Sequence, residues 1–251
     1  MKQFPITHVI LITLGAFLLF AAFGIKKKKV IFFIGPPTSG KTTAAKWCAK
    51  YNGWQHVCTE HLCLDHVKQK TELGKQMEPY VQAGGLVPDS VILPMLEKEI
   101  LDAFSRTDYV ILESFPRTTQ QATALAKLLE KKFGSTEFIV LNLHASDETI
   151  AQRIQNRFIC PNCKKSYILT QNSPLVPQKE MTCDKCGTHL AKKTDDIEQS
   201  IDERIAVFRQ YEQPLLEFYQ KAKTKIASYT ITLNKNNPLQ NQFQQISNLI
   251  A

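Results

Sequence analysis

The sequence predicts an α/β fold in which helices cover a parallel sheet, and two observations lead to that class. Short apolar runs that are typical of buried strands alternate along the chain with longer helical segments. A glycine-rich turn also joins the first of these runs, residues 30–34, directly to a helical segment at 43–50. Ligands of such folds bind beyond the carboxyl ends of the strands, so we expect the functional site at that edge of the sheet.

The remaining strands and one insert follow from local patterns. After the first run, strands are predicted at 54–58, 109–112, 138–143 and 229–233. Residues 158–193 are rich in Cys, Pro, Lys and Asn, a composition that does not fit a strand of a sheet core. This segment is therefore expected to be an insert outside the main sheet.

The helices between these strands are indicated by their ends. Residues 59–99 indicate several helices, broken at Gly84–Gly85, Pro88 and Pro94. A helix is expected from 116 to about 133, and Ser146 followed by acidic residues is typical of a helix start. A long helix is predicted from Asp195–Asp196 and a terminal one from Asn237–Pro238. The apolar stripe of the long helix consists of Ile197, Ile201, Ile205 and Phe208.

Composition fits one medium domain with an appendage. The chain has 251 residues, 43% of them hydrophobic and 22% charged, which excludes a disordered protein. Half of the formal net charge of +8 comes from the four lysines at 26–29, so a nucleic-acid-binding surface has weak support. Seven cysteines are present. Three of them, Cys48, Cys58 and Cys63, fit reduced thiols and indicate a reducing compartment.

The N-terminus predicts a membrane anchor. Residues 5–25 carry no charge and are dominated by Ile, Leu, Phe and Ala, and about 20 such residues span a bilayer core. The lysines at 26–29 follow directly, which places the rest of the chain in the cytoplasm by the positive-inside rule. We therefore expect residues 1–29 to form a transmembrane anchor with a basic flank. A signal peptide cleaved near 22–24 is the alternative, but lysines directly after the cleavage site would hinder export.

Residues 35–42, Gly-Pro-Pro-Thr-Ser-Gly-Lys-Thr, match the phosphate-binding loop pattern G-x-x-x-x-G-K-[ST], here called the P-loop. The loop lies between a strand and a helix, so its amides and those of the helix N-terminus favour an anion. Lys41 is expected on the β- and γ-phosphates, and a hydroxyl of Thr42 or Thr43 on Mg²⁺. The sequence thus predicts a nucleoside triphosphate site in a P-loop NTPase-type three-layer sandwich.

Two C-x-x-C pairs lie in the insert, and they predict a metal site. The four thiols belong to Cys160, Cys163, Cys183 and Cys186. Four protein thiolates complete the tetrahedral coordination of Zn²⁺ and leave no open position, so we expect a structural ion. A zinc ribbon that binds nucleic acid remains an alternative because lysines surround the pairs. A catalytic zinc and redox-active pairs explain the pattern less well.

Together, the motifs resemble those of the adenylate kinase family, in its long form with a zinc-binding lid. The resemblance spans residue 30 to the C-terminus. It rests on an ordered set that comprises the P-loop, Gly85-Leu86-Val87-Pro88-Asp89, Phe115-Pro116-Arg117-Thr118 with Gln121, Arg153, Arg157, the four cysteines, Asp195-Asp196 and Arg204.

The resemblance implies a nucleoside monophosphate kinase that moves the γ-phosphoryl of ATP to AMP and yields two ADP. It implies a helical arm that binds the monophosphate at 59–88 and a zinc-ribbon lid at 158–194. The expected cofactors are ATP, Mg²⁺ and structural Zn²⁺. The expected partners are ATP, AMP, ADP and, through the N-terminal helix, the cytoplasmic face of a membrane. We expect no nucleic-acid partner and a monomeric chain.

The resemblance also implies roles for individual positions. The residues expected to act on the transferred phosphoryl group are Lys41, Arg117, Arg153, Arg157 and Arg204. Those expected to hold ATP are Gly35, Thr38, Ser39, Gly40, Lys41, Thr42, Thr43, Arg153, Ser166 and Tyr167. Those expected to hold AMP are Thr59, Leu86, Val87, Ser114, Arg117, Gln121, Lys193 and Arg204. Those expected near Mg²⁺, partly through water, are Thr42, Thr43 and Glu113.

The sequence departs from the family pattern at several of its binding positions. Leu64 stands where the family usually has an arginine that holds the AMP phosphate, and Lys68 lies one helical turn further on. Glu113-Ser114 replaces an Asp-Gly pair, and Lys193 replaces an arginine of the lid. Thr42 replaces a glycine of the P-loop. The alternatives are therefore a kinase for another nucleoside monophosphate, or a nucleotide-binding pseudoenzyme that acts as an interaction module.

Overall fold

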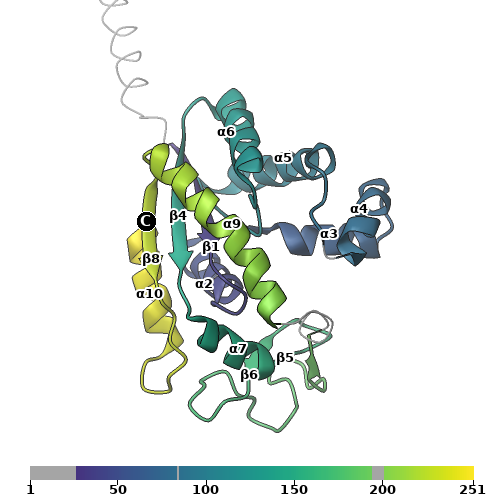
Figure 1. Cartoon of the computed structure of the whole chain (residues 1–251), viewed down its shortest axis with the longest axis vertical. Helices are drawn as coiled ribbons and strands as arrows, with labels where there is room; N and C mark the ends of the chain where they lie inside the picture. The colour runs from purple at the N-terminus through teal and green to yellow at the C-terminus, as the bar shows by residue number, and fades with distance from the viewer. Residues whose placement is uncertain (1–26, 84, 194–200) are drawn as a thin grey trace, which may run out of the picture.

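The computed structural model describes residues 27–83, 85–193 and 201–251. Its centre is a five-stranded sheet in the order β2-β3-β1-β4-β8, and every neighbouring pair is parallel (Figure 1). The strands are β1 (Lys28–Ile34), β2 (Gln55–Cys58), β3 (Tyr109–Glu113), β4 (Thr136–Leu143) and β8 (Lys225–Tyr229). The predicted α/β class with a parallel sheet is confirmed, and the strand that precedes the P-loop is central in it.

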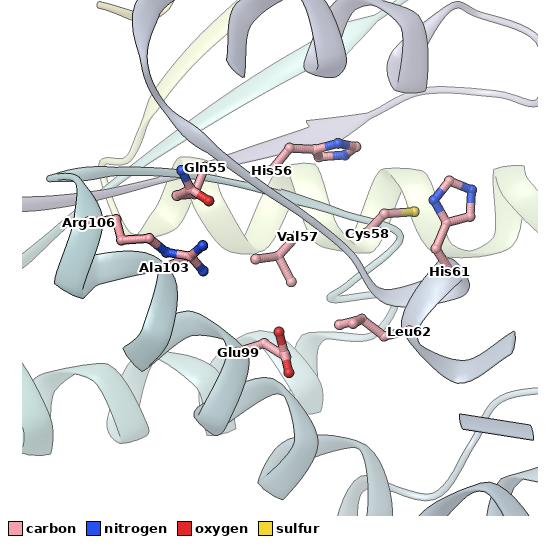
Figure 2. A pocket seen from close by; sticks show the side chains of 9 residues that line it. All are labelled: Gln55, His56, Val57, Cys58, His61, Leu62, Glu99, Ala103 and Arg106. Atoms are coloured by element: carbon pink, nitrogen blue, oxygen red, sulfur yellow. The ribbon is translucent and has the colours of Figure 1, made fainter. Parts of the chain in front are cut away.

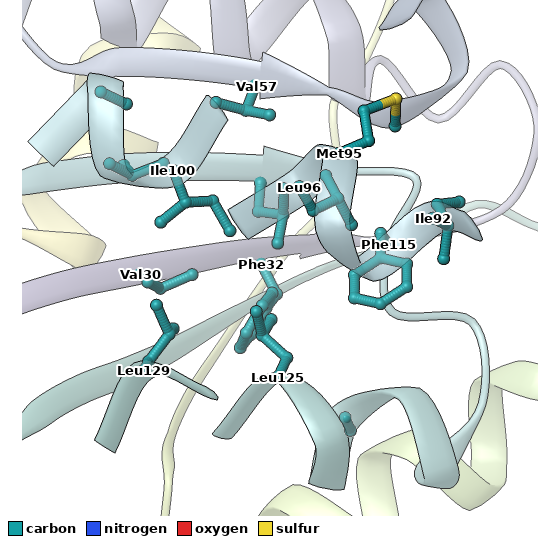
Figure 3. Packing of buried hydrophobic residues seen from close by; sticks show 14 of the residues in the cluster. Val30, Phe32, Val57, Ile92, Met95, Leu96, Ile100, Phe115, Leu125 and Leu129 are labelled. Atoms are coloured by element: carbon teal, nitrogen blue, oxygen red, sulfur yellow. The ribbon is translucent and has the colours of Figure 1, made fainter. Parts of the chain in front are cut away.

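Helices cover both faces of this sheet and complete three layers. On one face lie α2 (Lys41–Asn52) and α10 (Leu239–Ile250). On the other lie α5 (Asp89–Arg106), α6 (Thr119–Phe133) and α9 (Ile201–Lys221). Figure 3 shows part of the second core, where side chains of α5 and α6 meet those of β1 and β2.

The pleat of β1 explains why its sequence is apolar without interruption. Val30 and Phe32 belong to the core beneath α5, α6 and α9, whereas Ile31 and Phe33 belong to the core beneath α2 and α10. Successive side chains of a strand point to opposite faces, and here both faces are covered by helices. A strand that is covered on both faces needs an apolar residue at every position. This requirement explains the uninterrupted apolar sequence at residues 30–34.

Two further units project from the sandwich (Figure 1). The first, which we call the acceptor arm, consists of α3 (Thr59–Lys68) and α4 (Glu72–Gln82), which pack on each other. The second, which we call the lid, follows α7 (Asp147–Gln155) and contains an antiparallel sheet in the order β6-β5-β7. Its strands are β5 (Arg157–Ile159), β6 (Ser166–Ile168) and β7 (Ala191–Lys192).

Most predicted helix ends agree with the structure. The hydroxyl of Ser146 accepts a hydrogen bond from the amide of Thr149 and begins α7 as expected. Pro94, however, does not break a helix, because α5 continues through it. Ile92, Met95 and Leu96 around it are buried in the core, and this packing outweighs the lost backbone hydrogen bond.

The last strand was predicted too late in the chain. It ends at Tyr229, and Ile231 beyond it packs into the core beneath α2 and α10. Because β8 is an edge strand paired only with β4, its residues need not be uniformly apolar. The alternation at 229–233 therefore gave a stronger strand signal than the true strand did.

Two predictions fall on residues outside the described part of the chain. They are the membrane anchor at 5–25 and the start of the long helix at Asp195–Asp196, with Ile197 of its stripe. Among the helices that the structure describes, none combines the length and apolarity needed to cross a bilayer. The described portion of the long helix buries Ile205 and half-buries Ile201 and Phe208, as its stripe predicts.

Candidate active site

Glycine is required at both ends of the P-loop. Gly35 has φ +154° and Gly40 has φ +99°, and both values are disfavoured for other residues. A β-carbon at Gly35 would lie 2.6 Å from the carbonyl oxygen of Leu143, and one at Gly40 would lie 2.8 Å from Ile231 Cδ1. The loop can therefore wind tightly between β1 and α2 only with glycines at these positions.

Lys41 is the first residue of α2, and its ammonium group turns back over the loop. Its Nζ donates hydrogen bonds to the carbonyl oxygens of Gly35 at 2.7 Å and Pro36 at 2.8 Å. Burial lowers its pKa to about 8, the charge of Glu113 opposes that shift, and the charges of Arg117 and Arg157 reinforce it. Two predicted phosphate-binding arginines therefore act electrostatically on the P-loop lysine.

Arg153, on α7, ties the loop to the end of the sheet. Its side chain is buried, and its guanidinium donates to the carbonyl oxygens of Thr38 at 3.0 Å and Ile231 at 2.6 Å. Burial lowers the pKa of this guanidinium, which nevertheless stays charged. Arg153 is thus adjacent to the P-loop, as predicted, and two of its five donors hold backbone carbonyls there.

Glu113 ends β3 beside the P-loop and is held by two hydrogen bonds. Its Oε1 accepts from the hydroxyl of Thr42, and its Oε2 accepts from Nε2 of His56 at 2.8 Å. Burial alone would raise the pKa of Glu113, but these bonds outweigh it and leave the pKa lowered. A hydroxyl and a charged carboxylate at this point are the oxygen donors that Mg²⁺ prefers, so the residues fit the ion. Thr43, the other predicted Mg²⁺ residue, is exposed on the same turn.

Several predicted AMP-binding residues lie on α3, on α6 and in the segments that precede α5 and α6. Gln121 is buried, where its Oε1 accepts from the amide of Arg117 at 2.8 Å and its Nε2 donates to Asp89 Oδ1 at 2.9 Å. Thr59 is buried at the start of α3, and its hydroxyl has no hydrogen-bond partner among the residues that the structure describes. Ser114 has φ +65°, a value suited to the glycine that the family usually has there.

The other acceptor positions differ in exposure. Val87 is buried and Leu86 is exposed beside it, so only one of this pair contributes to the core. The Arg117 side chain is exposed, and its Nε donates to the carbonyl oxygen of Ser114 at 3.3 Å. Leu64, which replaces the expected arginine, is 45% exposed on α3.

A salt bridge links the lid to the acceptor arm. Lys193 Nζ lies 3.3 Å from Oε1 of Glu60, the second residue of α3. Both side chains are partly exposed, so the pair contributes at most about 1 kcal/mol. Arg157 and Arg204 are half-buried and each has a partner. Arg204 lies near the start of the described part of α9, whose preceding residues 194–200 are outside it.

The four lid cysteines converge as the sequence predicted. Their sulfurs all lie within 4.8 Å of one another, with Cys160 and Cys186 at 3.4 Å and Cys163 and Cys183 at 3.5 Å. A tetrahedral ion with Zn–S bonds of about 2.3 Å needs sulfurs about 3.8 Å apart. The four thiols therefore fit Zn²⁺ and leave no coordination position for a substrate.

The two turns that carry these cysteines share one backbone design. Lys164 donates its amide to the carbonyl of Cys160 at 2.9 Å, and Gly187 donates to Cys183 at 2.8 Å. Both donors have positive φ, +59° and +71° respectively. The two C-x-x-C pairs are thus equivalent in geometry, which supports a single ion shared between them.

The lid positions predicted near ATP have different surroundings. Ser166 is exposed, whereas the Tyr167 ring is buried in the lid core. The hydroxyl of Tyr167 donates to Cys183 Sγ at 3.5 Å and accepts from the amide of Asp184 at 2.8 Å. The Tyr167 side chain therefore supports the cysteine cluster. A contact between Tyr167 and ATP, as predicted, would have to be made by the Tyr167 backbone.

Two residues that lie at the site were not among the predicted site residues. His56 bonds to Glu113, and Cys58 lies in the same cluster, with its pKa raised to about 12 by burial. Both are on β2, two positions apart, so they share a face of the strand. The pattern His-x-Cys at the end of a strand was the available signal.

Comparison with known proteins identifies the family. The adenylate kinase family model matches residues 33–224. An adenylate kinase of Methanothrix thermoacetophila is 38% identical over 195 residues, which cover 76% of this chain and 86% of that protein. One of Chloroherpeton thalassium is 37% identical over 78% of this chain and 88% of its own length. One of Clostridium tetani is 31% identical over 88% of this chain and 98% of its own. The chain therefore belongs to the adenylate kinase family and is a nucleoside monophosphate kinase, a phosphotransferase.

Proposed function

We propose that the chain transfers the γ-phosphoryl group of ATP to AMP, with two ADP as products, at the cytoplasmic face of a membrane. The observation that carries the proposal is the meeting of charges at the P-loop. Arg117 and Arg157 act electrostatically on Lys41, Arg153 bonds to the loop, and Glu113 bonds to Thr42. These groups come from α2, β3, α7, β5 and the segment before α6, so the fold itself concentrates them.

The chemistry fits this arrangement. An AMP phosphate is already ionised at neutral pH, so the transfer needs positioning and cations, and it needs no general base. We assign the donor phosphates to the P-loop from Gly35 to Thr43, with Lys41 as the cation on the β- and γ-phosphates. When bound, Mg²⁺ would neutralise phosphate charge, and the residues that would hold it are Thr42, Thr43 and Glu113.

The arginines surround the transferred group in this proposal. Arg117 and Arg204 would contact the acceptor phosphate, whereas Arg153 and Arg157 would contact the donor side. Guanidinium groups bind phosphate oxygens through two parallel hydrogen bonds, which fixes orientation as well as charge. Lid closure would bring Arg157 over the phosphates and exclude water from the site. The exclusion of water would protect ATP from hydrolysis.

The acceptor base would lie against Gln121 and the 85–89 segment. Gln121 is held at both ends of its amide, by the Arg117 amide and by Asp89, so its orientation is set before a ligand binds. Thr59, Leu86, Val87 and Ser114 would complete this side. Lys193 would reach the AMP phosphate from the lid once its bond to Glu60 is released.

The membrane location rests on the apolar sequence at 5–25 and the lysines at 26–29. Fusing residues 1–29 to a reporter and fractionating the cells tests it. We expect the reporter in the membrane fraction and extracted only by detergent. Recovery in the soluble fraction would exclude the anchor and leave the proposed reaction untouched.

A coupled assay tests the acceptor. The purified chain is given ATP with AMP, dAMP, CMP, UMP or GMP, each in turn, and ADP formation is measured. We expect AMP to have the highest kcat/KM. A higher value with another monophosphate would reassign the acceptor, and ATP binding without turnover on any of them would identify a pseudoenzyme.

A further inference from the structure

A second group of metal-binding side chains lies at the carboxyl ends of β2 and β3. It consists of His56, Cys58 and Glu113, and each offers a donor atom within 4.8 Å of the others. Phosphoryl transfer in the proposed function uses only Glu113 of the three. The proposed function therefore gives no role to the imidazole of His56 or to the thiol of Cys58, although both are strong metal ligands.

The sheet itself determines how these side chains meet. Cys58 and Glu113 are register partners in the parallel pairing of β2 with β3. His56 is two residues before Cys58, so both side chains leave β2 on the same face. His56 Nε2 is already 2.8 Å from Glu113 Oε2, and Cys58 is 8% exposed and Glu113 2%. The three donors are thus held by backbone pairing and burial before any ion binds.

A cavity of about 200 Å³ lies beside His56 and Cys58 (Figure 2). It lies between β2, α3 and α5, and its lining includes His56, Cys58 and His61. Figure 2 shows Cys58 at the same end of the cavity as the two histidines, with Glu99 and Arg106 further along it.

We propose that His56, Cys58 and Glu113 bind one thiophilic divalent cation of the Zn²⁺ type, and that this ion inhibits phosphoryl transfer. Imidazole, thiolate and carboxylate are all Zn²⁺ ligands, and three of them with one open position form a common zinc geometry. Mg²⁺ takes oxygen ligands and would not use the thiol, so the site discriminates between the two ions.

Binding exchanges existing bonds for metal–ligand bonds. The Cys58 thiol loses its proton to solvent, and the Nε2 proton of His56 is exchanged through solvent to Nδ1, so that Nε2 is free to bind. The hydrogen bond between His56 and Glu113 is then replaced by one bond from each residue to the ion. The charge of the Glu113 carboxylate is then taken up by the bound ion, so it no longer serves the Mg²⁺ position of the proposed function. The inhibitory part of the inference rests on that function, whereas the binding part does not.

Zinc stoichiometry without nucleotide tests the binding. The full chain is equilibrated at a series of buffered free Zn²⁺ concentrations, and bound zinc per chain is measured by elemental analysis. We expect two ions per wild-type chain, the tighter one in the four-cysteine lid, and one ion in Cys58→Ala. Cys63→Ala removes another buried thiol, on α3, and is the matched control that keeps two. Co²⁺ loading checks the assignment, because one thiolate–cobalt absorption should disappear in Cys58→Ala and stay in Cys63→Ala.

The outcomes separate the two parts of the inference. One ion per wild-type chain, or two ions in a folded Cys58→Ala, would overturn the site. If Cys58→Ala does not fold by circular dichroism, His56→Gln removes a different donor and must lose the same ion. Zinc should inhibit the wild type and Cys63→Ala but not Cys58→Ala. Second-site binding without such inhibition would overturn the inhibitory role alone, and an inactive chain that still binds two ions would contradict only the proposed reaction.

Discussion

The P-loop and the acceptor arm would form their proposed sites in different ways. The P-loop offers backbone amides whose positions are set by two glycines and by its place between β1 and α2. The acceptor arm offers side chains on α3 and α4, which project from the sandwich. Its departures from the family pattern, Leu64 above all, change the groups that a ligand would meet.

This difference shows where substitutions matter. Thr42, which replaces a glycine of the family pattern, adds a side chain and leaves the loop amides in place. Its hydroxyl donates a hydrogen bond to Glu113. In the arm a ligand would meet mainly side chains, because most helix amides beyond the first turns are hydrogen-bonded within the helices. The phosphate-donor function should therefore withstand sequence change better than the choice of acceptor.

The largest effect is expected at the one P-loop side chain that backbone amides cannot replace. Lys41→Ala should lower kcat/KM by about 10²- to 10³-fold, because a preorganised cation at the transferred phosphoryl group is lost. Steady-state kinetics with ATP and AMP measures this change. Lys46→Ala, an exposed lysine on the same helix, is the control and should retain activity. Near-normal turnover of a folded Lys41→Ala would refute the donor assignment.

Gly74→Ala should break the acceptor arm and leave the P-loop intact. A β-carbon at Gly74 would lie 2.0 Å from the carbonyl oxygen of His66, so α3 and α4 could not approach each other as they do. Overpacking of this kind costs about 3 kcal/mol. Hydrogen exchange should rise in α3 and α4 but not in α2, and KM for AMP should rise more than KM for ATP. Gln76→Ala, exposed on the same helix, is the control, and equal protection in both variants would contradict the prediction.

ATP affinity should fall above pH 8 because Lys41 loses its proton there. Burial lowers the Lys41 pKa to about 8 in the free protein, and the negative charge of bound phosphates would raise it. Below pH 8 both states are protonated and the affinity is constant. Above it the Kd should increase by up to about tenfold per pH unit. Calorimetric titrations between pH 7 and 9.5 measure this slope, and a constant Kd over that range would show that Lys41 remains protonated.

The smallest effect concerns the backbone at the acceptor edge. Ser114→Gly should stabilise the fold by about 1 kcal/mol, because φ at this position is +65° and a left-handed conformation costs a side chain about that much. Chemical denaturation measures the free energy of unfolding. Ser114→Ala keeps the β-carbon and should show no gain, so an equal gain in both variants would mean that the serine hydroxyl is the cause.

Much of the fold followed from local patterns, and the errors have physical causes. The run at 30–34 was recognised because a central strand covered on both faces must be apolar throughout. The edge strand β8 was misplaced because its Lys-Ile-Ala-Ser-Tyr sequence meets no such requirement. Pro94 was taken as a helix end because the packing of its neighbours could not be read from the chain.

By itself the sequence determined the phosphate loop, the four-cysteine lid and the α/β class, because each depends on residues close together or regularly spaced in the chain. Only the tertiary structure decided that Glu113 bonds to Thr42 and His56, that Tyr167 supports the cysteine cluster, and that Cys58 faces Glu113. These contacts depend on strand register and on which face a side chain takes. Both are set when β2, β3 and α2 pack together, and no local pattern carries that information.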